Sequence, residues 1–178
     1  MLRATALALL LVTACATAEQ PTLPAANAMS GSPSETPLIN SSGAEIGIVQ
    51  FTPAPAGVLI RVVIQEGGLS AGWHGMHLHA VGDCSDPAKF EHAAGHIQKS
   101  NTYHGLLYVH GPENGDLPNI SAAADGSAAA EVFTSLLTLA DLQDADGSAM
   151  VIHANPDDHT SQPLGNSGDR VACAAIRK

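Results

Sequence analysis

Residues 75–79 read Gly75-Met76-His77-Leu78-His79, and this stretch decides the fold class. In a β-strand, side chains two residues apart point to the same face of the sheet. His77 and His79 would therefore place two imidazoles on one face, whereas Leu78 would point the other way, into a core. Histidine is the commonest metal ligand among the side chains. The stretch thus predicts a strand with a metal site on one face and a hydrophobic core on the other.

Further metal-binding residue types follow this strand in the sequence. His153 lies near the end of a second predicted strand. His96 and His104 lie eight residues apart in a segment over 82–116 with almost no strand pattern, and Asp116 ends that segment. A loop of this length needs a reason to be ordered, and coordination of a metal offsets the entropy lost on ordering. The donor types suit copper and zinc, because either metal accepts imidazole and zinc also accepts carboxylate.

Short segments rich in β-branched and aromatic residues recur along the chain. They predict strands at residues 45–52, 58–65, 75–81, 129–135, 149–154 and 170–176. Pro53, Pro55 and Gly57 indicate a hairpin turn between the first two, and residues 136–142 are predicted as a helical turn. Short strands that alternate with turns are typical of an antiparallel sandwich or barrel.

Histidine is unusually frequent, and basic residues are few. The 178 residues include nine His, seven Lys plus Arg, and 17 Asp plus Glu. The chain has no basic run or basic face, which argues against a nucleic-acid-binding protein. Because a buried histidine needs a partner, the abundance of histidine independently favours a metal site.

The first 14 residues have the pattern of an export signal. Arg3 precedes an apolar run that is shorter than the roughly 20 residues of a membrane-spanning helix. The run ends at Val12-Thr13-Ala14-Cys15, which resembles the lipobox of bacterial lipoproteins, where the cysteine becomes the lipidated N-terminus. The alternative is an ordinary signal peptide in which Cys15 is incidental.

The residues after Cys15 differ in composition from the rest of the chain. Residues 15–42 are rich in Pro, Ser, Ala and Asn without an apolar period, so they are predicted as a flexible tether. The folded domain is then expected at residues 43–178. The lipobox implies a periplasmic protein anchored to the cell envelope by its lipid, with the outer membrane favoured because Ala16 follows the cysteine.

Two long motifs resemble the signatures of copper/zinc superoxide dismutases. The first is residues 75–84, GMHLHAVGDC, and the second is residues 165–176, GNSGDRVACAAI. The elements between them follow in the same order, so the resemblance covers residues 43–178. It implies an all-β fold, a Greek-key β-sandwich or barrel of about eight antiparallel strands with a long metal-binding loop.

The resemblance implies copper ligands and catalytic residues. His77, His79 and His153 match copper ligands, and His96 matches the histidine that bridges copper and zinc. In this family the bridging histidine releases copper on reduction and takes up a proton. Arg170 matches the arginine that attracts and positions the superoxide anion. We therefore expect His96 and Arg170 to be the catalytic residues.

The resemblance also implies zinc ligands, with one departure. His104 and Asp116 match zinc ligands, but the family usually has a further histidine where this chain has Glu113. Three alternatives follow: Glu113 supplies a carboxylate oxygen, His110 replaces it, or the zinc site is weak or empty.

Three further residues receive a role from the resemblance. Asp157 matches the aspartate that links a copper histidine to a zinc histidine. Cys84 and Cys173 match the intrasubunit disulfide, which export to an oxidising compartment makes plausible. With Cys15 lipidated, all three cysteines of the chain have a role.

The implied function is disproportionation of superoxide to dioxygen and hydrogen peroxide by a bacterial envelope enzyme with copper and zinc. The expected partners are superoxide and, through the lipid anchor alone, a membrane; relatives occur as monomers and homodimers. The first alternative is a copper-binding or copper-buffering lipoprotein without turnover, which would not need Arg170. The second is an adhesion or scaffold module whose metals are only structural.

Overall fold

The computed structural model describes residues 32–178, and this part of the chain consists mainly of β-strands and loops. The nine strands within it are β1 (Ser34–Asn40), β2 (Glu45–Ala54), β3 (Gly57–Ile64), β4 (Gly72–His74), β5 (Met76–His79), β6 (Ile120–Ala122), β7 (Ala128–Thr134), β8 (Ser148–His153) and β9 (Arg170–Ile176). The helical elements are η1 (Glu91–Ala93) and α1 (Leu139–Leu142). All strand pairs are antiparallel, so the predicted fold class is confirmed. No helix within residues 32–178 is long and apolar enough to cross a membrane.

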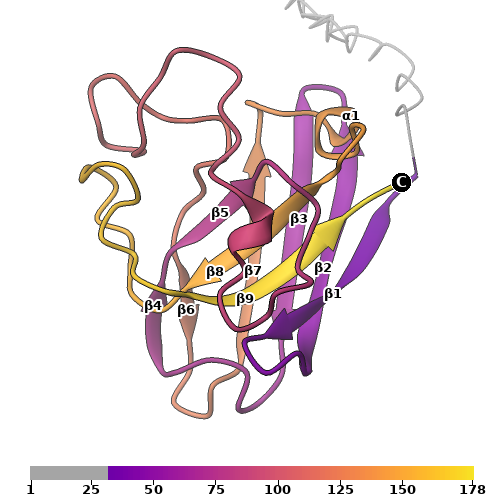
Figure 1. Ribbon diagram of the computed structural model, residues 1–178, viewed down its shortest axis with the longest axis vertical. Helices are drawn as coiled ribbons and strands as arrows, with labels where there is room; N and C mark the ends of the chain where they lie inside the picture. The colour runs from indigo at the N-terminus through magenta and orange to yellow at the C-terminus, as the bar shows by residue number, and fades with distance from the viewer. Residues whose placement is uncertain (1–31) are drawn as a thin grey trace, which may run out of the picture.

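Seven of the strands form one curled sheet in the order β5-β8-β9-β1-β2-β3-β7 (Figure 1). The other two strands, β4 and β6, pair with each other. β4 leads into β5 through Gly75, and β6 leads into β7 through a turn at residues 123–127. Because β5 and β7 are the edges of the seven-stranded sheet, the β4–β6 pair joins these edges and closes a barrel. Closure protects the edges from pairing with other chains.

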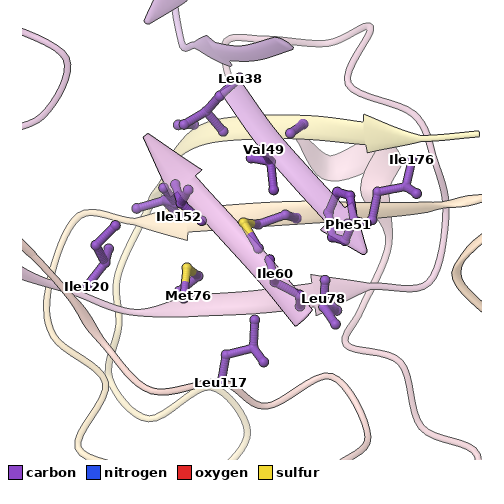
Figure 2. Close-up of a cluster of buried hydrophobic side chains, with 14 of the residues drawn as sticks. Leu38, Val49, Phe51, Ile60, Met76, Leu78, Leu117, Ile120, Ile152 and Ile176 are labelled. Carbon is purple, nitrogen blue, oxygen red and sulfur yellow. The ribbon is translucent and has the colours of Figure 1, made fainter. Parts of the chain in front are cut away.

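The hydrophobic core fills the inside of this barrel. In β3, Val58, Ile60 and Val62 are fully buried, whereas Arg61 between them is exposed. This period of two is the pattern of a strand with one face on a core. Figure 2 shows side chains from several strands and loops that meet there, among them Leu38, Val49, Phe51, Ile60, Met76, Leu78, Leu117, Ile120, Ile152 and Ile176. Leu78 is fully buried in this core, as its place between two histidines predicted.

Strand β1 lies where the sequence predicted a tether. It pairs with β2 along its length and with β9 through Ile39 and Asn40, and it buries Leu38 completely. The predicted boundary at residue 43 therefore needs correction, because the folded part begins by Ser34. Pro37 hid the strand in the sequence, since proline cannot donate to a ladder; it is tolerated here because β9 pairs with other residues of β1. The predicted signal peptide and Cys15 lie outside the described residues.

The other differences concern short elements. The single strand predicted at residues 75–81 is divided at Gly75 into β4 and β5, and β6 has only three residues. Trp73 of β4 is 59% exposed and does not pack in the core. The helical turn is confirmed as α1, which begins with a capping box between Thr138 and Asp141.

Two long connections lie on the same side of the barrel (Figure 1). They are residues 80–119, after β5, and residues 154–169, after β8. Gln162 Nε2 of the second donates to the His104 carbonyl of the first (2.7 Å), and Leu107 N donates to the His159 carbonyl (3.1 Å). The predicted disulfide between Cys84 and Cys173 is confirmed, and it ties the first connection to β9.

Candidate metal centre

Strands β5 and β8 hold three histidines side by side. In this antiparallel pair His77 lies opposite Val151 and His79 opposite Ala149. His77 and His79 share a face because they are two residues apart in a strand, and His153 is the last residue of β8. Each of the three is at most 1% exposed. The structure thus brings together the three histidines that the sequence predicted as copper ligands.

The connection over residues 80–119 runs alongside β5 and adds His96 and Asp116. Isolated bridges join His96 to His79 and Asp116 to His77. This approach requires glycine at position 115, where a β-carbon would lie 2.1 Å from a backbone oxygen of β5. The segment without strand pattern is therefore ordered against the strand that carries the His-x-His pair.

Four histidines form a cluster that we call the four-imidazole cluster: His77, His79, His96 and His153. One donor nitrogen from each lies within 4.8 Å of the others. In each, one ring nitrogen is buried without a hydrogen-bond partner among the described residues, namely Nδ1 of His77 and Nε2 of the other three. Leaving one such atom unpaired costs roughly 1–3 kcal/mol. A shared metal ion would satisfy all four atoms.

Backbone carbonyls fix the ring orientation of two members. His79 Nδ1 donates to the Ala94 carbonyl (2.9 Å), and His153 Nδ1 donates to the Gly168 carbonyl (3.0 Å). A carbonyl only accepts, so Nδ1 carries the proton and Nε2 presents its lone pair to the cluster. This tautomer is the one that a metal requires.

A second group, which we call the mixed cluster, consists of His96, His104, Glu113 and Asp116, whose donor atoms also lie within 4.8 Å of one another. His104 Nδ1 lies 2.8 Å from Asp116 Oδ1, and His96 Nδ1 lies 3.0 Å from Glu113 Oε2 and 3.4 Å from Asp116 Oδ1. His96 therefore faces the mixed cluster with Nδ1 and the four-imidazole cluster with Nε2. This is the geometry of an imidazole that could bridge two metal ions.

His110, the alternative to Glu113, lies outside both clusters. It is exposed, and its ring lies 6.3 Å from that of Tyr103 and 5.8 Å from that of Tyr108. Glu113 instead turns toward His96, with its side chain 15% exposed. Among the three alternatives, the geometry favours Glu113 as the fourth donor.

Asp157 links the two clusters by hydrogen bonds to one histidine of each. Its Oδ2 accepts from His77 Nε2 (2.8 Å) and its Oδ1 accepts from His104 Nε2 (3.2 Å), and its side chain is fully buried. The contact with Nε2 of His77 leaves Nδ1 of that ring free to face the four-imidazole cluster. A carboxylate in this place orients both rings and raises their basicity.

The pKa values of the histidines differ between the two clusters. Burial lowers the pKa of His77 to about 4 and that of His153 to about 3, and it holds the pKa of His79 well below its usual value. Burial also acts on His104, but hydrogen bonds to Asp116 and Asp157 outweigh it and raise the pKa to about 10. The pKa values of both carboxyls are lowered, because these hydrogen bonds overcome their desolvation.

Arg170 lies beside the four-imidazole cluster. Its guanidinium donates to the carbonyls of Phe90 (2.5 Å) and Ala94 (2.6 Å), and Ala94 also accepts from His79. Arg170 and Lys89 help to line a surface hollow of about 560 Å³. Glu91 and Asp169 also line this hollow, so its lining carries both signs of charge. The carbonyl of Ala94, which accepts from both Arg170 and His79, places the guanidinium next to the cluster.

The remaining histidines have other surroundings. His74 is buried and bonds to the carbonyls of His153 (2.7 Å) and Ser70 (2.8 Å), which give its ring a structural role. His92 is exposed near Asp83 and Asp86. Sequence reasoning missed the contact of His159 with Asp157 and the carbonyls that hold the cluster rings, because backbone groups carry no residue signature.

The donor sets of the two clusters fit different metals. Four neutral imidazoles suit copper, for which imidazole is a good ligand. Two imidazoles and two carboxylates suit zinc, which accepts nitrogen and oxygen donors in a tetrahedral site. The residues present therefore fit a copper ion and a zinc ion that share His96.

Comparisons with known proteins agree with this geometry. Residues 45–176 match the family described as copper/zinc superoxide dismutase. A superoxide dismutase [Cu-Zn] of Caulobacter vibrioides is 47% identical over 142 residues, which cover 76% of this chain and 80% of the relative.

Solved structures of similar fold include an enzyme and an enzyme-like protein. A double mutant of a superoxide dismutase-like protein from Bacillus subtilis has a TM-score of 0.72 at 30% identity and covers 81% of this chain and 97% of its own. The Cu/Zn superoxide dismutase of Brucella abortus has a TM-score of 0.68 at 29% identity, with 82% and 99% covered. With the two clusters, the disulfide and the barrel in place, the chain belongs to the copper/zinc superoxide dismutase family.

Proposed function

We propose that the chain is a superoxide dismutase that converts superoxide to dioxygen and hydrogen peroxide at a copper centre in the bacterial cell envelope. The observation that carries this proposal is the set of four buried, unpaired imidazole nitrogens directed at one another beside a fixed arginine. The family match and the named relative support the same activity.

His77, His79, His153 and His96 are the proposed copper ligands. Three of them lie on β5 and β8, whose backbone hydrogen bonds limit their movement. Rigid strands place ligands more accurately than loops do. His96 comes from the connection over residues 80–119, so it is the member whose position depends on a loop.

His96, His104, Asp116 and Glu113 are the proposed zinc ligands. Glu113 takes the place of a histidine, so the site would hold two carboxylates. With a divalent zinc ion and neutral imidazoles, the formal charges of the mixed cluster would cancel. The site would then add no net positive charge to the surroundings of the substrate, so the local attraction for an anion would come from Arg170 and from the copper ion itself.

Copper, when bound, supplies the one-electron redox chemistry that zinc cannot. Arg170 binds the superoxide anion, because its guanidinium is fixed by two carbonyls and lies beside the cluster. His96 can hold a proton at Nε2, the nitrogen that faces the substrate side. Its Nδ1 faces Glu113 and Asp116, so Nε2 is the ring nitrogen left to take up a proton on the side of the four-imidazole cluster. A proton held there can be donated to the peroxide as it forms.

The envelope location rests on the N-terminal sequence and on the disulfide. We propose that residues 1–14 are a signal peptide and that Cys15 is lipidated, which would hold the enzyme to a membrane, favoured as the outer one. The disulfide between Cys84 and Cys173 fits an oxidising compartment such as the periplasm.

Removal of the Arg170 charge tests the function. In Arg170→Gln, we expect the bound copper to be unchanged and kcat/KM for superoxide to fall by about tenfold or more, because the local attraction is lost. Arg170→Lys keeps the charge and should recover part of the loss. If Arg170→Gln bound copper and retained full turnover, the proposed role would be wrong. Bound copper without turnover in the unmodified chain would instead indicate a copper-buffering protein.

A further inference from the structure

We propose that His159 is a positioning residue that holds Asp157, and through it the rings of His77 and His104. The inference rests on the proposed function, since it concerns how the two metal clusters are held together.

His159 lies against the Asp157 carboxylate, two residues further along the connection after β8. Its side chain is only 18% exposed, and its Nδ1 lies 3.4 Å from Asp157 Oδ2. At this distance the contact is electrostatic rather than a well-formed hydrogen bond. The backbone N–H of His159 also donates to Asp157 Oδ1 (2.6 Å). Both oxygens of the carboxylate therefore face this residue.

Asn119 determines which nitrogen of His159 carries the proton. Asn119 Oδ1 accepts from the Asp157 backbone N–H (2.8 Å), so the amide is oriented with Nδ2 on the other side. That Nδ2 donates to the Asp157 carbonyl (2.8 Å) and lies 3.2 Å from His159 Nε2. An amide NH₂ group only donates, so Nε2 accepts. In the neutral ring the proton is then on Nδ1, which faces Asp157.

The carboxylate of Asp157 thus has three histidines around it. His77 and His104 donate to its two oxygens, and His159 presents a ring N–H dipole to Oδ2. A carboxylate with several donors around it cannot rotate easily, so the two rings that it orients are fixed as well. Without the ring of His159, only the backbone N–H of this residue would still hold the carboxylate, at Oδ1.

The backbone of His159 has a separate structural task. Its φ angle is 60°, in the left-handed region that Gly and Asn adopt more readily than other residues. Its carbonyl accepts from Leu107 N (3.1 Å), which joins the two long connections whatever the side chain. Substitutions must therefore keep this backbone if they are to report on the ring alone.

His159→Asn and His159→Asp have side chains of equal shape, so together they separate the effect of the ring contact from that of the backbone conformation. His159→Asn keeps an N–H donor near the position of Nδ1. His159→Asp has the same shape as His159→Asn, but it places a second carboxylate next to that of Asp157, and the like charges repel. Both residues tolerate the left-handed conformation. His159→Gly removes the side chain without adding strain. Thermal unfolding of the metal-free variants would show that each of them folds.

The measurement is zinc release to a chromogenic chelator from the copper- and zinc-loaded full chain, together with the EPR spectrum of Cu(II). We expect His159→Gly to release zinc about tenfold faster, at the lower end of the range for partners of metal ligands, and to shift the copper hyperfine splitting. His159→Asp should release zinc faster still. His159→Asn should remain close to the unmodified chain in both measurements.

Two results would overturn the inference while the proposed function stands. The first is an unmodified chain that binds copper and zinc and turns over, with His159→Gly and His159→Asp indistinguishable from it. The second is equal zinc loss in all three variants, which would show that a side-chain N–H donor at position 159 does not affect zinc binding. If the unmodified chain bound neither metal, the proposed function would fail, and this inference would fail with it.

Discussion

The two clusters share His96 but differ in what their imidazoles face. In the four-imidazole cluster, the rings of His77, His79 and His153 direct unpaired nitrogens at one another, and burial lowers their pKa values. In the mixed cluster, His104 faces Asp116 and its pKa is raised to about 10. Rings that are equally inaccessible to solvent therefore have opposite charge preferences.

The difference shows how one fold can build two different donor sets that share His96. The neutral imidazoles are presented with free lone pairs, which suits copper. The carboxylates of the mixed cluster already carry the charge that a divalent zinc ion neutralises. Asp157 contacts both clusters, because it accepts from His77 of the four-imidazole cluster and from His104 of the mixed cluster. The following experiments test whether the clusters are as distinct as their surroundings indicate.

The largest effect is expected from the loss of a ligand in the four-imidazole cluster. His153→Ala should bring superoxide turnover down to the level of the metal-free protein, because it removes a nitrogen on a rigid strand. His110→Ala is the matched control, since His110 is exposed and lies outside both clusters. Retained turnover in His153→Ala, or an equal loss in His110→Ala, would contradict the assignment.

The next effect concerns the mixed cluster alone. Glu113→Ala should weaken zinc binding by more than about 100-fold, the upper range for loss of an outer partner, since Glu113 is a proposed direct ligand. Copper content should stay at one ion per chain. Glu113→His supplies a nitrogen donor instead and should keep zinc. Competition with a chelator measures the zinc affinity. An unchanged affinity in Glu113→Ala would show that Glu113 is not the fourth ligand, so that either His110 is or the zinc has three protein ligands.

A substitution at Asp157 should affect both clusters at once. Asp157→Asn keeps the shape but places an N–H group opposite one of two ring N–H donors. We expect zinc affinity to fall by about 10- to 100-fold and the Cu(II) EPR spectrum to change. If only one of the two metals responded, Asp157 would not be the link between the clusters.

The last prediction is a pH dependence of the metal-free protein, in which the clusters act in opposite directions. Folded-state pKa values of about 4 for His77 and about 3 for His153 lie below the unfolded value of about 6.5. The unfolded chain then binds more protons in that window, so the free energy of unfolding falls as pH drops from about 6.5 to about 4. The slope is about 1.4 kcal/mol per pH unit for each proton.

For His104 the sign is reversed. Its folded pKa of about 10 lies above the unfolded value, so its contribution is complete below about pH 6.5 and is lost as the pH rises toward 10. Urea unfolding of the metal-free chain should therefore show a maximum of stability near neutral pH. In His104→Ala the decline on the alkaline side should become smaller. A stability that rises steadily toward pH 4 would contradict these pKa directions.

Local periodicity made much of the barrel and the four-imidazole cluster predictable. His77 and His79 share a face in any strand, and the apolar residues around them require a core on the other face. His153 could be placed near them because it lies in another strand-like segment. Strand β1 could not be found in the same way, because Pro37 and an exposed, polar composition hide a strand that buries Leu38.

The mixed cluster was less predictable, because contacts between distant residues build it. Glu113 and His110 were equivalent in the sequence, and the loop conformation separates them. That conformation depends on Asp116, whose Oδ2 accepts from the backbone N–H groups of Gly105 (2.8 Å) and Glu113 (2.9 Å). The contact of His159 with Asp157 is equally invisible in the sequence, since it depends on the fold of the connection after β8.

If the chain is a working dismutase, its two clusters should bind different metals. Metal content and superoxide turnover should be measured on the same preparation of the full chain after loading with copper and zinc; a fragment that begins at residue 43 would lack β1. We expect one copper and one zinc per chain, with rapid turnover. Bound copper and zinc without turnover, or turnover in a chain that holds no copper, would show that the proposed function is wrong.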